Sequence, residues 1–204
     1  LIALNALYRP GPLGSGMAEV YVKRALGKEE VEYLFPELED ILGDSYGIIL
    51  YQEQVMRISV VIAGFSMSKA DVMRKIMGKK QVEKLPAIKK DFMEGALKKG
   101  HDKKKLEELF SQMETFAEYG FNKSHSTAYG YLAYQTAYLK AHYPIYFMSA
   151  NLSSEAEKSS TTSNVIQYIS ETKKMGFKIL PPDINKSYRN FRVESPTALR
   201  FGLG

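Results

Sequence analysis

The 204-residue chain contains no cysteine. Disulfide bonds and thiolate metal sites are therefore excluded, and a reducing compartment, the cytoplasm, is the expected location. The three histidines, His101, His125 and His142, are far apart and share no metal-ligand spacing. No apolar run reaches the roughly 18 residues that a membrane-spanning helix needs. These absences direct attention to the charged residues.

The chain also lacks the common signatures of nucleotide chemistry and hydrolysis. It has neither a Gly-x-x-x-x-Gly-Lys loop nor a Gly-x-Gly-x-x-Gly sequence. It has no Asp-x-Asp pair that could hold two metal ions about 4 Å apart. Ser124 and Ser126 flank His125, but no carboxylate is placed to complete a nucleophilic triad. We expect a chain without catalytic residues or metal ligands, which could bind phosphates but should not catalyse alone.

Positive charge is concentrated in one segment. Between residues 69 and 105, thirteen basic residues accompany five acidic ones, so this segment carries +8 while the whole chain carries +5. A basic segment on a weakly acidic body indicates a polyanion partner. A solvated, lysine-rich helix face is the alternative.

Hydrophobic periodicity predicts a mainly α-helical protein with a short β-hairpin element at the C-terminal end. Two prolines and three glycines in residues 9–16 predict a rigid, irregular turn that carries Arg9. Tyr131, Tyr134 and Tyr138 fall on one helix face, a spacing more typical of core packing or helix contact than of base stacking. The helices are predicted over residues 17–26, 36–43, 46–65, 68–78, 81–99, 102–119, 126–142, 146–152 and 165–175, and the strands over 177–180, 191–193 and 199–201.

Residues 120–126 form a glycine-hinged loop that opens into the long helix, which Ser124 or Ser126 is expected to cap. Helix N-termini carry unpaired N–H groups and a positive dipole end, so they attract anions. Together with Lys123 and His125, this helix start is a plausible phosphate site. Residues 69–80 supply a second set of cations that could meet it.

Six stretches in register resemble one family over nearly the whole chain. Their order and spacing are similar to those of the alpha subunit of bacterial DNA polymerase III, the family C replicative polymerase. The stretches are residues 7–13, 46–56, 70–80, 120–126, 134–144 and 179–185.

The resemblance implies the fingers region of a DNA-directed DNA polymerase. Residues 1–16 would be the end of the palm or a connector, residues 17–176 the helical fingers domain, and residues 177–204 the truncated start of a β-containing segment. The catalytic aspartates, and the Mg²⁺ that they hold, would lie in a palm outside this chain, which should be inactive when isolated. The implied partners are dNTP and primer-template DNA and, for the full-length subunit, the sliding clamp, the proofreading exonuclease and the clamp-loader subunits.

The resemblance also assigns residues to a nucleotide site and to DNA. Arg74 is the stronger phosphate ligand, because the family often has arginine where Lys75 stands, and lysine lacks bidentate geometry. The alternative to this assignment is a stand-alone helical module that binds nucleic acid and has no nucleotide site. The expected nucleotide-binding residues are Arg74, Lys75, Asn122, Lys123, Ser124 and His125, and the expected DNA-binding residues are Lys79, Lys80 and Arg9.

Overall fold

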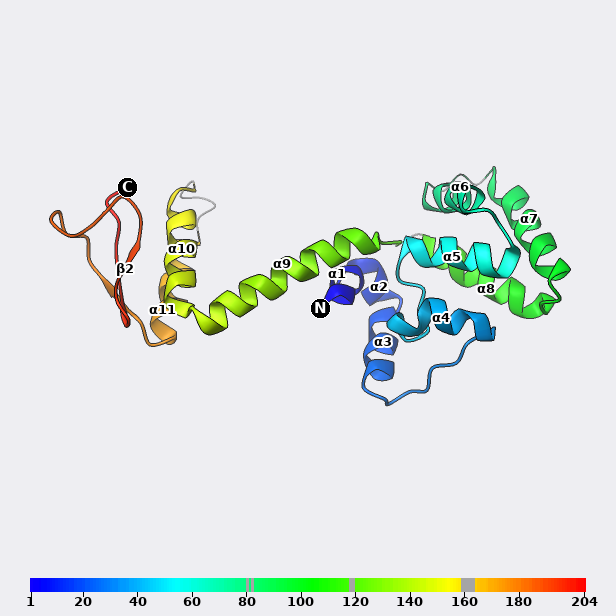
Figure 1. The fold of residues 1–204 in the computed structure, drawn as a ribbon, viewed down its shortest axis with the longest axis horizontal. Coiled ribbons are helices and arrows are strands. Elements are labelled where there is room, and N and C mark those ends of the chain that lie inside the picture. The colour runs from blue at the N-terminus through cyan, green and yellow to red at the C-terminus, as the bar shows by residue number, and fades with distance from the viewer. Residues whose placement is uncertain (80, 82, 118–119, 159–163) are drawn as a thin grey trace. The chain divides into compact units, whose positions relative to one another are not determined.

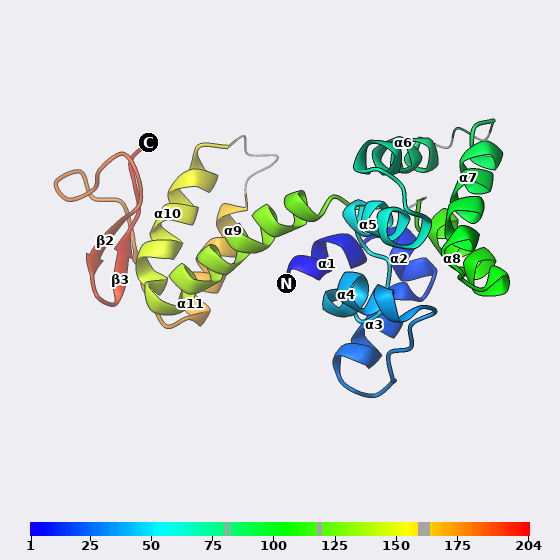
Figure 2. The ribbon, with the colours of Figure 1, turned by 45° about the vertical axis from the view of Figure 1, so that its right-hand side comes forward.

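A computed structural model shows that the chain divides into two compact units, residues 1–131 and 132–204. Both are drawn in Figures 1 and 2, and each is described separately below. Most described residues lie in helices, and the three strands are close to the C-terminus, so the predicted fold class is confirmed. The structure describes residues 1–79, 81, 83–117, 120–158 and 164–204.

Three short helices begin the first unit: α1 (Ile2–Leu7), α2 (Pro10–Gly14) and α3 (Met17–Ala25). The prediction that residues 9–16 are irregular was wrong, because α2 lies within them. Pro10 occupies the first helical position, where its missing N–H removes no helical hydrogen bond and its fixed φ favours the helix.

The main core of this unit lies among α5 (Gln52–Ala63), α6 (Met67–Gly78), α7 (Leu85–Lys98) and α8 (Lys103–Ala117), which Figure 1 shows gathered together. Each of these helices has an apolar stripe facing the others, as its spacing predicted. The rings of Phe65, Phe92 and Phe110 pack edge to face in sequence, and fully buried aliphatic side chains surround them. These include Ile58, Ile62, Met73, Leu106, Leu109 and Met113.

Helix α5 begins later than predicted. Residues 46–51 were expected to be helical, but they form an extended approach to α5. Tyr46 and Gly47 adopt φ values of +53° and +77°, which end the preceding turn, and the β-branched Ile48 and Ile49 favour extended backbone. The segment before this approach contains η1 (Pro36–Leu38), α4 (Glu39–Leu42) and η2 (Gly43–Ser45), so helical structure does begin at Pro36.

Side-chain caps fix several helix starts in this unit. Asp102 accepts a hydrogen bond from the Lys105 N–H at 3.0 Å and so caps α8, whose predicted range began at residue 102. Helix α6 is capped by Ser66, which accepts from the Lys69 N–H at 3.2 Å, so this helix begins just before its predicted range of 68–78.

The long helix α9 (Lys123–His142) begins in the first unit, where it packs on α1. A Cβ atom at Gly130 would lie 2.8 Å from the Ile2 side chain, and the buried Ser126 hydroxyl donates to the Ile2 carbonyl. The tyrosines of α9 are exposed, at 63% for Tyr131, 62% for Tyr134 and 46% for Tyr138. The part of the prediction that placed them in the core was therefore wrong.

In the second unit, α10 (Pro144–Ala156) and α11 (Val165–Lys174) pack against a three-stranded sheet of β1 (Lys178–Leu180), β2 (Arg192–Ser195) and β3 (Ala198–Arg200). Figure 2 shows β2 and β3 beside α10. The strand order is β1-β3-β2, with β1 parallel and β2 antiparallel to β3, so the predicted hairpin is confirmed.

The connection predicted over residues 153–163 differs from the structure in its first part, because α10 continues to Ala156. Residues 159–163 lie outside the described part of the chain. No helix among the described residues is long and apolar enough to cross a membrane.

Candidate functional site

Three consecutive polar side chains in the first turn of α5 connect separate parts of the first unit. We call Gln52, Glu53 and Gln54 the α5 junction. Successive residues of an α-helix point about 100° apart, so the three side chains reach in different directions. Gln54 contacts the segment before α5, Gln52 contacts α6 and the loop before α9, and Glu53 contacts the start of α9.

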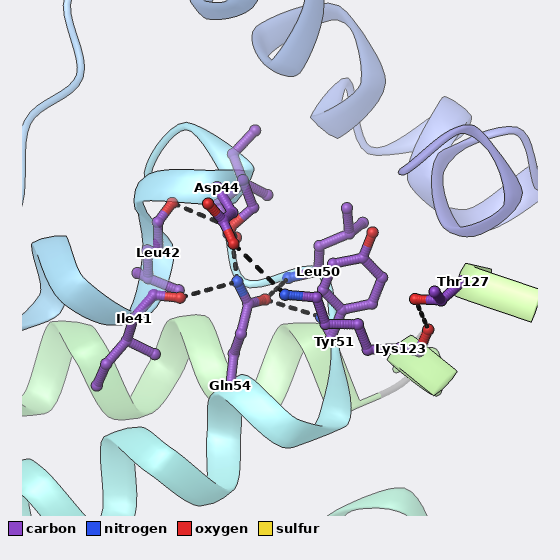
Figure 3. Close-up of polar contacts among 10 residues, drawn as sticks. Ile41, Leu42, Asp44, Leu50, Tyr51, Gln54, Lys123 and Thr127 are labelled. Carbon is purple, nitrogen blue, oxygen red and sulfur yellow. Dashed lines mark hydrogen bonds and ion pairs between the residues drawn. The ribbon is translucent and has the colours of Figure 1, made fainter. Parts of the chain in front are cut away.

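Gln54 fixes the approach to α5 (Figure 3). Its side-chain oxygen accepts from the backbone N–H groups of Leu50 at 2.8 Å and Tyr51 at 2.9 Å. Its amide nitrogen donates to the Ile41 carbonyl at 3.2 Å and to the Ser45 hydroxyl at 2.6 Å. Because Gln54 is only 5% exposed, these bonds satisfy groups that water cannot reach.

Gln52 links Arg74 to the loop that precedes α9. Its side-chain oxygen accepts from Arg74 Nη1 at 3.2 Å, and its amide nitrogen donates to the Gly120 carbonyl at 3.4 Å. Its backbone N–H donates to the Phe121 carbonyl at 2.9 Å. The same residue therefore contacts both of the stretches that the sequence proposed for phosphate binding. A small pocket here is lined by Gln52, Val55, Arg74, Met77, Gly78, Phe116 and Gly120.

Arg74 and Lys75 share one carboxylate on α6. Nε and Nη2 of Arg74 lie 3.0 and 2.7 Å from Asp71 Oδ1, and Nζ of Lys75 lies 2.7 Å from Asp71 Oδ2. Hydrogen bonds from Lys75 and Arg74 lower the pKa of Asp71 below its usual value. Asp71 thus holds both cations beside the pocket.

The Glu53 carboxylate forms hydrogen bonds at the start of α9. Its two carboxylate oxygens accept from the Lys123 N–H at 3.2 and 3.0 Å, and one accepts from the Asn122 amide at 3.0 Å. Asn122 is the helix cap, because its Oδ1 accepts from the His125 N–H at 2.8 Å. The expected caps, Ser124 and Ser126, lie inside the helix. Backbone donors that were expected to attract a phosphate are therefore bonded to Glu53 and Asn122.

The side chain of Lys123 lies over Tyr51, with Nζ 5.6 Å from the ring centre and 3.5 Å from Asp44 Oδ2 (Figure 3). Burial raises the pKa of Tyr51, and a hydrogen bond with Ser126 partly opposes this rise. Ser124 and His125 are exposed on the same turn. Contacts to a phosphate at this helix start would therefore come mainly from the side chains of Lys123, Ser124 and His125.

Arg9 lies beside the same loop. Its guanidinium stacks 4.8 Å above the Phe121 ring, which packs edge to face on His125 at 5.5 Å. The Tyr129 ring follows at 4.6 Å from His125. Arg9, expected to bind DNA, thus belongs to the same cluster as His125.

Part of the positive charge of the lysine-rich segment is balanced by neighbouring acidic side chains. Lys79 is exposed at the end of α6, and Lys80 lies outside the described residues. Several other lysines pair with acids on the helix surfaces, which favours the solvated-face alternative for them. These pairs are Lys69–Asp91 at 2.6 Å, Lys89–Glu114 at 3.5 Å, Lys90–Glu94 at 3.9 Å and Lys103–Glu107 at 3.9 Å.

Among the described residues, the His, Asp and Glu side chains form no group of three or more that could hold a metal ion.

Sequence reasoning proposed Arg74 and Lys123 as phosphate ligands but missed the α5 junction, which contacts both residues. Gln52 and Glu53 entered the sequence analysis only as members of the predicted helix over residues 46–65 and of the family stretch over residues 46–56. The available signal was a run of three polar residues, Gln-Glu-Gln, inside an otherwise apolar segment. Only the structure shows which segments they contact.

Known proteins match this chain over its whole length. The family model described as the bacterial DNA polymerase III alpha subunit finger domain matches residues 1–100. The DNA polymerase III subunit alpha of Aquifex aeolicus is 48% identical over 203 residues, which are 100% of this chain and 17% of the relative. The subunit of the same name from Treponema pallidum is 50% identical over 193 residues, 95% of this chain and 16% of the relative.

The Escherichia coli subunit of that name is 44% identical over 209 residues, 100% of this chain and 18% of the relative. The chain therefore spans about a sixth of the length of the relatives that it matches. It belongs to the family of bacterial DNA polymerase III alpha subunits, and its first hundred residues match the finger domain of that family.

Proposed function

We propose that this chain, as part of a replicative DNA polymerase, binds the triphosphate of the incoming dNTP and the primer-template DNA during nucleotidyl transfer. The main support is the junction at Gln52. It brings Arg74, on α6, to the same pocket as Gly120, at the loop that leads into Lys123 and His125. The two cationic stretches lie about fifty residues apart in sequence.

Arg74 has the capacity to bind a phosphate without losing its present contacts. A guanidinium carries five N–H donors. Among the contacts of the described residues, Arg74 uses three of them, two on Asp71 and one on Gln52. The remaining donors could bind phosphate oxygens, neutralise charge on the leaving pyrophosphate and orient the α-phosphorus for in-line attack. Lys75, Lys123 and His125 would add further positive charge or donors.

The remaining parts of the proposal concern the full-length subunit. Aspartates outside this chain would hold Mg²⁺, so the isolated chain is expected to be inactive. Arg9, Lys79 and Lys80 would contact the DNA backbone, with an affinity that falls as salt rises. Contacts with the sliding clamp, proofreading exonuclease and clamp-loader subunits, and a cytoplasmic location, complete the proposal.

The test is steady-state incorporation by the full-length polymerase carrying Arg74→Ala. We expect the KM for dNTP to rise about tenfold or more, because hydrogen bonds between charged groups each contribute about 1.5–3 kcal/mol. The matched control is Arg57→Ala, which removes an exposed arginine of α5 that is not part of the proposed site. An unchanged KM in Arg74→Ala would contradict the nucleotide site.

Photo-crosslinking with a dNTP analogue provides an independent test. We expect labelling near Arg74 or Lys123, and its loss in Arg74→Ala, with Lys28→Ala as an exposed-lysine control. Labelling that is unaffected by Arg74→Ala, together with DNA binding that ignores dNTP, would instead support a nucleic-acid-binding module without a nucleotide site.

A further inference from the structure

We infer that Glu53 is a positioning residue that sets the place of the α9 cations relative to Arg74. This inference rests on the proposed function, because it concerns how the same nucleotide site is assembled. Glu53 itself is not expected to touch the nucleotide, since a carboxylate would repel phosphate.

Glu53 holds the start of α9 through hydrogen bonds. It bonds to the first N–H of α9 with both oxygens and to the amide of the helix cap, Asn122. A carboxylate at a helix N-terminus is favourable because it faces the positive end of the helix dipole. The Cα position of Lys123, and hence the reach of its side chain, is therefore tied to α5.

The other half of the proposed site is tied to the same helical turn. Gln52, the residue before Glu53, holds Arg74 Nη1 and the Gly120 carbonyl. Gln54, the residue after it, anchors the turn to buried backbone groups of the preceding segment. The separation between Arg74 and Lys123 is thus set through the α5 junction.

Glu53 uses backbone donors and leaves the ammonium group of Lys123 exchangeable. The acidic partner of that ammonium is Asp44, at 3.5 Å and with an 88% exposed side chain. Such an exposed pair contributes little stability. A triphosphate could therefore replace Asp44 while Glu53 keeps the start of α9 in place.

The experiment measures kcat and KM for dNTP in the full-length polymerase with Glu53→Ala, Lys123→Ala and the double substitution. We expect Glu53→Ala to raise KM about fivefold or more, with kcat within about twofold of the wild type. If Glu53 affects KM only by positioning the Lys123 side chain, removing Glu53 should have little further effect once that side chain is absent. The double variant should then have nearly the same KM as Lys123→Ala.

Conservative and control variants separate positioning from general destabilisation. Glu53→Gln should raise KM less than Glu53→Ala does, because the glutamine side-chain oxygen can still accept a hydrogen bond from the Lys123 N–H. Glu37→Ala removes an exposed acid of the same unit and should leave KM unchanged. Melting temperatures of all variants show whether any change in KM follows stability alone, which would overturn the inference.

The possible failures are distinguishable. If Arg74→Ala and Lys123→Ala both leave KM unchanged, the proposed nucleotide site is wrong, and this inference falls with it. If both raise KM, but Glu53→Ala does not, or its effect adds in full to that of Lys123→Ala, then Glu53 does not position Lys123, while the proposed function stands.

Discussion

At the scale of single residues, Gln54 shows how the hydrogen bonds of one side chain can organise a segment. Replacing it by leucine would leave the buried N–H groups of Leu50 and Tyr51 without acceptors. Each such loss costs about 1–3 kcal/mol, so we expect Gln54→Leu to lower the free energy of unfolding by about 2–4 kcal/mol. Urea unfolding followed by circular dichroism measures this.

The matched control for Gln54→Leu is Gln112→Leu, which changes an exposed glutamine on α8. Its free energy of unfolding should stay within about 0.5 kcal/mol of the wild type. Equal losses in the two variants would show that the hydrogen bonds of Gln54 are not the cause.

Asp71 gives a pH prediction with a definite sign. Its pKa is lowered in the folded chain by hydrogen bonds from Lys75 and Arg74, so the unfolded chain takes up the proton first as pH falls. The stabilisation is complete well above the unfolded pKa of about 3.9, and it is lost as pH falls through the lower, folded pKa. We expect Asp71→Asn to lower the melting temperature at pH 7, and the difference from the wild type to shrink as pH falls below the unfolded pKa.

The comparison for Asp71 is Asp40→Asn, which alters an exposed aspartate on α4. Its melting curve should track the wild type at both pH values. A gap between Asp71→Asn and the wild type that stays constant from pH 7 to pH 3 would contradict the assigned ion pairs.

The sequence indicates which residues carry charge or can cap a helix more readily than it indicates where their side chains lie. Charge and motif alone pointed to the cations Arg74 and Lys123 as candidate phosphate ligands. The cap Asn122 was missed because nearby Ser124 and Ser126 are equally good candidates by type. Only backbone conformation decides among neighbouring cap residues.

At the scale of elements, the close approach of α7 to the end of α5 depends on Gly95. A Cβ atom there would lie 2.2 Å from the backbone oxygen of Ala63, which cannot move as a side chain would. We expect Gly95→Ala to destabilise the chain by about 1–3 kcal/mol, despite the better helix propensity of alanine. Differential scanning calorimetry measures the loss.

The control for Gly95→Ala is Gly14→Ala at the end of α2, where no atom lies within 4 Å of the added Cβ. This variant should be neutral or slightly stabilised. If both alanine variants behave alike, steric contact between α5 and α7 is not what requires glycine.

Elements with strong periodicity were predicted well, and their ends less well. Helices α8 and α11 and the β2–β3 hairpin lie close to the predicted ranges, because apolar spacing and turn residues agree there. The first six residues assigned to α5 form a turn at Tyr46 and Gly47 and then a non-helical approach, since apolar spacing alone does not separate a helix from a buried extended segment. Helix α2 was missed because proline was taken only as a breaker.

At the scale of the whole molecule, the two units have separate cores. In the described part of the chain, the clusters around Phe92 and around Leu50 lie in the first unit, and the cluster around Leu152 lies in the second. We expect calorimetry to resolve two transitions. Leu152 is fully buried in the second unit. Leu152→Ala should lower the free energy of unfolding of that unit by about 2–5 kcal/mol and leave the transition of the first unit unchanged.

The reciprocal variant is Met113→Ala in the first unit, which should move the other transition. Variants that shift both transitions equally would show that the chain unfolds as one cooperative body.

The boundary between the two units, which falls within α9, could not be predicted from the sequence, because the helical pattern runs continuously from residue 123 to residue 142. The domain boundary at residue 176 remains a prediction.

The α5 junction has a consequence for how this region can change during evolution. Three consecutive residues serve three different partners, so their order along the helix matters as much as their chemistry. Inserting or deleting one residue in this turn would rotate every following side chain by about 100° and give each partner its neighbour's group. The turn should therefore tolerate conservative replacement, such as glutamate by glutamine, better than any change of length.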